Sequence, residues 1–251
     1  MIDQFHRTAL LIGRENIEKL RNRRVAVFGV GGVGGHAAEA LCRSGIGKID
    51  VVDGDVVDIT NINRQLIATH KTLGHDKVDV IKDRMLEINP DVKVTAYKTF
   101  YLPETADSID LSVYDYIVDA IDTMTAKIEL VSRAAALGVP VISSMGAANK
   151  IDPAAFEVAD IYETSVCPMA RIMRKELRKR GVTTLKVVYS KEVQHKGVFA
   201  NYRILNPEQN EGSFLDDPAN HANRPLPASI SFVPPVAGLI LAGEVIRDLI
   251  E

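Results

Sequence analysis

A glycine-rich segment between an apolar strand and a helical pattern constrains the fold of this chain more than any other stretch. Residues 25–28 are all apolar and read as a buried strand, and a helical pattern begins near Ala37. Between them, glycines that leave the backbone N–H groups open at the positive end of a helix predict a phosphate-binding turn. The glycines of this fingerprint are Gly29, Gly31, Gly32 and Gly34. The alternative is a glycine-rich turn without a ligand.

An acidic residue stands where a nucleotide site of this kind needs one. A second expected strand, residues 48–53, ends on Asp53, which follows Gly29 by 24 residues. A carboxylate at this position typically accepts hydrogen bonds from a ribose hydroxyl. The two features together predict a nucleotide site rather than a bare turn.

Strand and helix patterns alternate along the first 146 residues. Further strands are expected at 92–97, 114–119 and 140–145, and helices at about 77–88 and 123–137. This alternation predicts an α/β fold, a Rossmann-like, mostly parallel sheet with helices on both faces.

The regular alternation of strands and helices changes after Gly146. Two strands at 156–159 and 185–189 flank a basic helix at 168–180, and a final helix covers 236–250. Residues 194–229, rich in Asn, Pro and Gly, predict a long loop. These elements are too few for a second core. We therefore expect one domain over 1–251, with a nucleotide-binding core at about 24–146 and a smaller C-terminal α+β extension at about 147–251 that faces the substrate.

Composition limits the partners and the compartment. The net charge of −3 gives no overall attraction to nucleic acid, so such binding needs a local patch. The two cysteines, Cys42 and Cys167, form no CxxC pair, which favours a reducing compartment over a zinc ribbon or a disulfide scaffold. No apolar run reaches the roughly 20 residues of a membrane span, and the amino terminus lacks a signal-peptide layout. We expect a cytoplasmic protein without a membrane partner.

Charged residues near the carboxyl ends of the expected strands decide between two nucleotides. NAD and hydride transfer is the simplest interpretation of the glycine fingerprint. Cations for a triphosphate and carboxylates for Mg²⁺ favour phosphoryl or nucleotidyl transfer instead. The cations are Arg64, Lys77 and Lys127, and the carboxylates are Asp119 and Asp122. Taken singly, Lys77 has the alternative of a solvated helix residue and Asp122 that of a helix N-cap.

Five motifs in order resemble the adenylating core of the ThiF/MoeB/HesA superfamily of ubiquitin-activating-like enzymes, over about residues 4–145. They are Gly29-x-Gly31-Gly32-Val33-Gly34, Asp53-x-Asp55, Asn61-x-x-Arg64-Gln65, Gly74-x-x-Lys77 and Asp119-x-x-Asp122. The resemblance implies ATP with Mg²⁺ as the nucleotide. It also implies a homodimer, in which Arg7 reaches the triphosphate of the partner subunit.

The same resemblance implies roles for individual residues. Asp53 would hold the ribose, beside Asp55, while Arg64 and Lys77 would contact the phosphates. Asp122 would bind Mg²⁺. Asn61 and Gln65 would line the site. Arg7, Arg64, Lys77 and Asp122 form the expected catalytic set.

The second half of the chain resembles one branch of that superfamily, the tRNA threonylcarbamoyladenosine dehydratases. The motifs are Asp152-Pro-x-x-Phe156-x-Val158-Ala-Asp160, Leu177-Arg-Lys-Arg-Gly181 and Ser229-Ile-Ser-Phe-Val-Pro234 with Gly238. The branch implies ATP-dependent activation of the threonyl carboxylate on an adenosine in the tRNA anticodon stem-loop, followed by cyclisation with net loss of water. Whether activation proceeds by adenylation or by phosphorylation stays open.

Two other functions remain as alternatives. One is adenylation of the carboxyl terminus of a ubiquitin-like sulfur-carrier protein, and the other is nucleotide sensing without turnover. A sulfur-transfer protein is a further candidate partner of the dehydratase branch.

The basic helix at 168–180 predicts a surface for tRNA phosphates. Its cations fall on one helical face, opposite an apolar face. The cations are Arg171, Arg174, Lys175, Arg178 and Lys179, and the apolar residues are Met169, Ile172, Met173 and Leu177. A solvated face, or a surface for an acidic protein, are the alternatives. Cys167, just before the helix, is either a buried bystander or a thiol that the helix dipole activates for a thioester.

Overall fold

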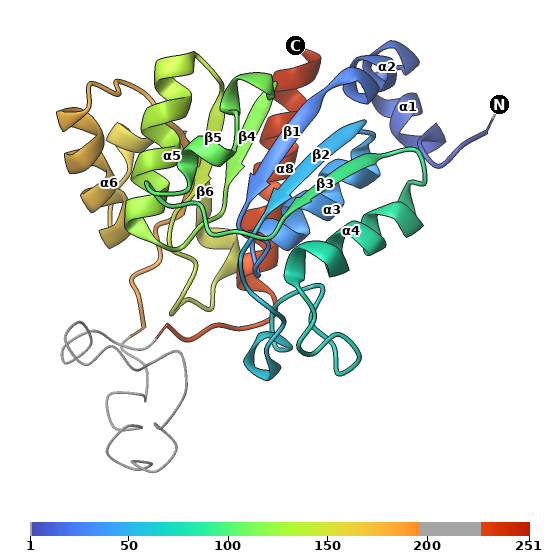
Figure 1. Cartoon of the computed structure of the whole chain (residues 1–251). Coiled ribbons are helices and arrows are strands. Elements are labelled where there is room, and N and C mark those ends of the chain that lie inside the picture. Colours follow the sequence, from blue (N-terminus) through green and yellow to red (C-terminus); the bar gives the residue numbers. More distant parts are fainter. Residues whose placement is uncertain (1, 196–226) are drawn as a thin grey trace.

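The computed structural model describes residues 2–195 and 227–251. They form an α/β fold around one seven-stranded sheet with the order β3-β2-β1-β4-β5-β7-β6 (Figure 1). All neighbouring strands run parallel except β6, which pairs with β7 in antiparallel register. The strands are β1 (Arg24–Phe28), β2 (Lys48–Val52), β3 (Lys93–Tyr97), β4 (Tyr116–Asp119), β5 (Val141–Ser144), β6 (Phe156–Asp160) and β7 (Lys186–Ser190).

Helices cover both faces of the sheet, as the sequence predicts. On one face, α3 (Gly34–Ser44), α4 (Lys77–Ile88) and α8 (Val233–Ile250) enclose the largest apolar cluster, with α2 (Arg14–Asn22) at its rim. On the other face, α5 (Met124–Leu137) and α6 (Pro168–Lys179) pack together. β1 supplies both layers because strand side chains alternate: Val25 and Val27 face the first cluster, and Ala26 and Phe28 the second face.

Short sequence signals set the ends of these helices. Gly45 and Gly138, both in the left-handed region, end α3 and α5 where the sequence places glycine stops. Asn89 ends α4 just before Pro90. The expected helical lead-in is two helices, because Gly13 at φ +87° separates α1 (His6–Ile12) from α2.

The elements after Gly146 extend the same sheet. β7 continues it beside β5, and β6 forms its edge. The last helix, α8, packs along α3 from the first half of the chain. α8 begins at Val233, three residues before the expected start. The predicted loop at 194–229 lies mostly outside the described residues. No helix in the described part of the chain combines the length and apolarity needed to cross a bilayer.

Candidate nucleotide site

The glycine turn lies between the end of β1 and the start of α3, at the carboxyl edge of the parallel strands. Gly29 has φ +85°, and a Cβ there would lie 2.7 Å from the Ala120 carbonyl oxygen of the neighbouring strand connection. A Cβ on Gly34 would overlap the Gly29 carbonyl oxygen. Both positions therefore need glycine for the backbone to turn. Gly31 and Gly32 are partly open, and they face Gln65 and Arg64.

Asp53 holds this turn from the end of β2. Its carboxylate accepts hydrogen bonds from the backbone N–H groups of Val30, at 2.7 Å, and Asp55, at 2.9 Å. Burial raises the pKa of Asp53, although Lys77 and the two N–H donors act against that shift. The carboxylate is thus fixed beside the glycine turn.

Lys77 is buried at the first position of α4. Its side chain is 7% exposed, and its Nζ lies 2.8 Å from Oδ2 of Asp55. The Lys77 N–H also donates to the Asp55 carbonyl oxygen at 3.1 Å. The alternative of a solvated helix residue is therefore wrong. A cation stands beside Asp53 and Asp55 at the edge of the glycine turn.

The turn at residues 61–65 contributes three expected site residues. Arg64 lies against Gly32 and donates to the Thr60 carbonyl oxygen at 2.8 Å and to Asn63 Oδ1 at 2.9 Å. Burial lowers the pKa of Arg64, while the charge of Asp122 acts in the opposite direction, so the two groups are electrostatic neighbours. Asn61 is buried, and its Oδ1 accepts from the Asp58 N–H at 3.2 Å, which makes it a brace of the turn.

Gln65 supplies an unpaired polar atom. Its side chain is buried and faces Gly31, and its Oε1 has no hydrogen-bond partner among the described residues. A buried acceptor without a partner costs free energy of about 1–3 kcal/mol, so Gln65 Oε1 is free to accept a hydrogen bond from a ligand at the turn. With the open glycines and the buried cation of Lys77, this acceptor makes the residues present suitable for a nucleotide with phosphates.

Asp122 is exposed two positions before α5. Thr123 is the N-cap residue of α5, so the alternative that Asp122 caps this helix is wrong. The described residues contain no group of three or more His, Cys, Asp or Glu side chains that could hold a metal by themselves. Mg²⁺ in nucleotide sites is commonly held by one or two carboxylates together with the phosphates, a pattern that Asp122 fits.

Asp119 and Lys127 are wrongly assigned by the sequence analysis. Both side chains are fully buried, and Lys127 Nζ lies 2.9 Å from Oδ2 of Asp119. Ser143 donates to the same carboxylate at 2.6 Å, and Lys127 donates to the Ile121 carbonyl oxygen at 3.0 Å. These two charges satisfy each other inside the protein, which leaves neither for phosphate or Mg²⁺. They brace the connection that carries Asp122.

Arg7 does not join the other site residues. It is exposed on α1, and Phe5, two residues earlier, packs against Gly45 at the carboxyl end of α3. Figure 1 shows α1 at the opposite end of the sheet from the loops that follow β1 and β2. Arg7 therefore cannot reach the glycine turn of its own chain.

The amino end of α8 is a part of the site that the sequence analysis does not assign. Pro234 lies against Gly32, and a Cβ on Gly238 would meet the Val33 carbonyl oxygen at 2.3 Å. Asn63 donates to the Ser229 carbonyl oxygen at 3.0 Å. Ser229 Oγ is buried and, within the described ranges, unpaired. The signal for this close contact is Gly238, a glycine at the sixth position of the apolar helix α8.

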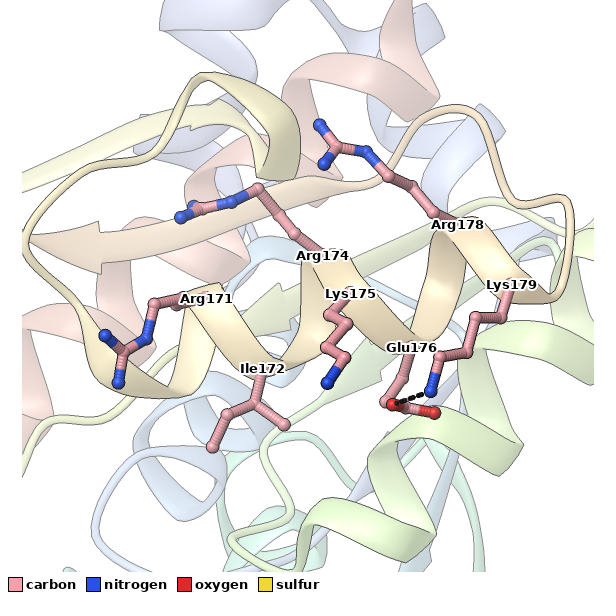
Figure 2. Close-up of a pocket in the computed structure, with 7 residues that line it drawn as sticks. All are labelled: Arg171, Ile172, Arg174, Lys175, Glu176, Arg178 and Lys179. Carbon is pink, nitrogen blue, oxygen red and sulfur yellow. Dashed lines mark hydrogen bonds and ion pairs between the residues drawn. The ribbon is translucent and has the colours of Figure 1, made fainter.

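The basic helix differs from its expected pattern at two positions. Arg174 is half-buried and donates to the Thr164 carbonyl oxygen at 2.9 Å and also to the Thr164 hydroxyl, so it braces the segment before α6. Ile172, expected on the apolar face, is 42% exposed and lies among the cations (Figure 2). Met173 and Leu177 are buried as expected.

Cys167 is 5% exposed and packs in the apolar cluster between α5 and α6. The nearby ammonium of Lys150 donates to the Glu192 carbonyl oxygen at 2.6 Å. This environment favours the buried bystander over an accessible thiol. Cys42 is likewise buried, and burial raises the pKa of its thiol to about 11.

Three comparisons relate this geometry to known proteins. The sequence is 44% identical over 252 residues to the tRNA threonylcarbamoyladenosine dehydratase of Bacillus subtilis, covering 100% of this chain and 96% of that protein. The crystal structure of Escherichia coli tRNA N6-threonylcarbamoyladenosine dehydratase, TcdA, with AMP superposes with a TM-score of 0.83 at 28% identity, covering 98% of this chain and 93% of that one. The same enzyme with ATP gives 0.80 at 27% identity and the same coverage. The sequence also matches the ThiF family over residues 5–251, and the chain therefore belongs to the ThiF family.

Proposed function

We propose that this chain is an ATP-dependent tRNA threonylcarbamoyladenosine dehydratase. The observation that carries the proposal is the full-length similarity to the Bacillus subtilis enzyme of that name, and the buried Lys77 beside the glycine turn supports it. The solved complexes of the Escherichia coli relative with AMP and ATP support ATP as the nucleotide. The reaction activates the threonyl carboxylate of the modified adenosine, which then cyclises with net loss of water.

The side chains around the glycine turn suit activation by ATP. We infer that Asp53 holds the ribose and that the turn at Gly29, Gly31, Gly32 and Gly34 receives the phosphates. Arg64 and Lys77 would neutralise phosphate charge, which is the main contribution a protein makes to such transfers. Asp122, exposed beside Arg64, would hold Mg²⁺ together with the phosphates. Gln65 Oε1 and Ser229 Oγ, which have no hydrogen-bond partner among the described residues, would be available to the rest of the substrate.

We further infer a homodimer with shared sites. Arg7 lies away from its own glycine turn, so a catalytic Arg7 must act on a second copy. Helix α1 buries none of its residues, and Leu10 and Leu11 are 76% and 85% exposed. Exposed leucines beside Arg7 support a covering subunit, because a second copy would remove this apolar surface from water.

The substrate-facing role of residues 147–251 rests on the basic helix α6. Two buried free cysteines suit a reducing cytoplasm. Adenylation of a ubiquitin-like sulfur carrier has less support, because the full-length similarity is to the tRNA enzymes. A sulfur-transfer protein partner stays a candidate only.

The nucleotide assignment is tested by thermal protection and product analysis. ATP with Mg²⁺ should raise the melting temperature, since a ligand at 100 times its dissociation constant adds about 2.7 kcal/mol, while NAD should not. Labelled ATP should then yield AMP and pyrophosphate in a tRNA-dependent manner if the carboxylate is adenylated, or ADP and phosphate if it is phosphorylated. Equal protection by NAD and ATP would contradict the proposal.

A further inference from the structure

Helix α6 carries a dense concentration of positive charge. Between Cys167 and Gly181 there are six basic residues and one acid, Glu176, which gives +5 in a chain of net charge −3. An open hollow runs along this helix and is lined by its cationic side chains (Figure 2). A net-acidic protein that binds a polyanion needs such a concentration of charge.

The structure separates the available cations from those already engaged. Lys179 and Arg180 pair with Glu176 at 2.7 Å and 3.1 Å, and Arg174 is held by Thr164. Arg171 and Lys175 are exposed, and no hydrogen bond or ion pair to another described residue engages either side chain. They lie one helical turn apart, about 6 Å along the axis, on the outer side of α6.

A second hollow adjoins the first at Arg178. It is lined by Tyr162, Arg178 and residues 181–183. The Arg178 guanidinium carbon lies 4.9 Å from the centre of the Tyr162 ring. Arginine and tyrosine planes are the surfaces on which unpaired RNA bases stack. An apolar anchor of the kind that dominates protein interfaces is nearly missing here: Ile172 is the one aliphatic side chain among the residues that line the first hollow.

The place of α6 in the fold connects this surface to the nucleotide site. A Cβ on Gly146, just after β5, would lie 4.0 Å from Cε of Met169 in the first turn of α6. The amino end of α6 thus lies beside the carboxyl edge of the sheet, where the glycine turn also lies. Arg171 stands near that end, and Lys175 and Arg178 follow along the helix.

We propose that the outer side of α6 is an RNA-binding surface, in which Arg171 and Lys175 contact backbone phosphates and the Arg178–Tyr162 pair receives an unpaired base. This inference rests on the proposed function, because it supplies the surface on which a tRNA substrate lies while one nucleotide reaches the glycine turn. Two cations without a partner among the described residues, an arginine over a tyrosine ring and so little apolar surface together favour RNA over an acidic protein.

The test is tRNA binding by the full chain with Arg171→Gln and Lys175→Gln. Fluorescence anisotropy with tRNA that carries threonylcarbamoyladenosine should show affinity reduced on the order of tenfold or more at moderate salt. The slope of log affinity against log salt should become shallower by about 1.4–1.8, because two phosphate contacts are lost. Protection by ATP should stay unchanged, which shows that the fold and the nucleotide site are intact.

The matched control replaces two other exposed lysines. Lys48 and Lys93 stand side by side at the amino ends of β2 and β3, away from α6. Lys48→Gln with Lys93→Gln removes the same charge, and it should leave tRNA affinity and the salt slope close to those of the parent. An equal loss in both double variants would show that only net charge matters and would overturn the proposal.

Three further outcomes distinguish a failure of the α6 surface from a failure of the proposed function. If the parent binds tRNA and the α6 variant binds it equally well, the α6 surface is not the RNA site, and the proposed function stands without it. If the variant keeps tRNA but loses binding to polyglutamate, the surface serves an acidic protein, which also contradicts the proposal. If the parent fails to bind tRNA at all, both the proposed function and this inference fail.

Discussion

The Nζ atom of Lys77 lies 2.8 Å from Oδ2 of Asp55, and its side chain is 7% exposed at the first position of α4. A cation at the amino end of a helix opposes the helix dipole, and its burial adds a cost of desolvation. Asp55 offsets both costs. The lysine cation is therefore held at the glycine turn, at a position where helix stability alone would not favour a positive charge. That arrangement is expected of a site that receives phosphate.

Lys77→Met should lower ATP-dependent turnover by about 10²–10³-fold, because one preorganised electrostatic contact is lost. The single variant also leaves Asp55 unpaired, so Lys77→Met with Asp55→Asn should recover stability in urea unfolding without recovering turnover. Lys98→Met, at a lysine that is 51% exposed and paired with Asp76, is the matched control and should keep near-normal activity. Normal turnover by the Lys77→Met chain would show that this cation does not contact phosphate.

The buried pair of Asp119 and Lys127 predicts a different pattern. Lys127→Met should lower the free energy of unfolding by about 3–5 kcal/mol, since it leaves a buried carboxylate uncompensated. Lys127→Met with Asp119→Asn should cost less than the single change. Urea unfolding measures both, and the ATP affinity of the folded fraction should change little. A Lys127→Met chain as stable as the parent would be incompatible with the buried ion pair.

His36 makes the glycine turn sensitive to acid. Burial lowers the pKa of His36 below its usual 6.5, and its Nδ1 lies 2.9 Å from the Gly32 carbonyl oxygen. The unfolded chain then binds more protons than the folded one as pH falls through 6.5, so folding stability is lost on acidification in this window. His36→Gln should lose less stability than the parent between pH 7 and pH 5 in urea unfolding. Identical pH dependence of the two chains would refute this account of His36.

The shared-site dimer is tested by mixing inactive chains. Arg7→Ala and Asp122→Ala should each lose turnover, and their mixture should recover about a quarter of parent activity, since half of randomly exchanged dimers hold one intact site of two. Subunit exchange is verified with a tagged chain. No recovery after verified exchange would place Arg7 outside the partner's site.

Patterns that depend on backbone geometry could be predicted from sequence. The strand–glycine–helix unit, the glycine stops of α3 and α5 and the α/β alternation all follow from local residue types, and the structure confirms them. The ends of parallel strands meet at one edge, which is why Asp53 and the turn at 61–65 could be assigned to one region before any coordinates.

The burial of charged side chains is harder to predict from the sequence. Asp119 ends β4 and Lys127 lies in the helix that follows, yet the two side chains pair with each other inside the protein. The signal that could have shown this is periodicity: Lys127 shares a helical face with Leu130, Val131 and Ala134, all buried. For Arg174 no such signal exists, since its partner Thr164 is brought close only by the turn before α6.

The central claim is that this chain dehydrates a modified adenosine in tRNA at the expense of ATP. The most direct measurement is mass spectrometry of nucleosides from tRNA that carries threonylcarbamoyladenosine, after incubation with the protein and ATP–Mg²⁺. The account predicts that threonylcarbamoyladenosine is replaced by a nucleoside lighter by one water, only when ATP is present and not with Lys77→Met. Unchanged nucleoside masses with an enzyme that binds ATP, together with adenylation of a ubiquitin-like carrier's carboxyl terminus, would contradict it.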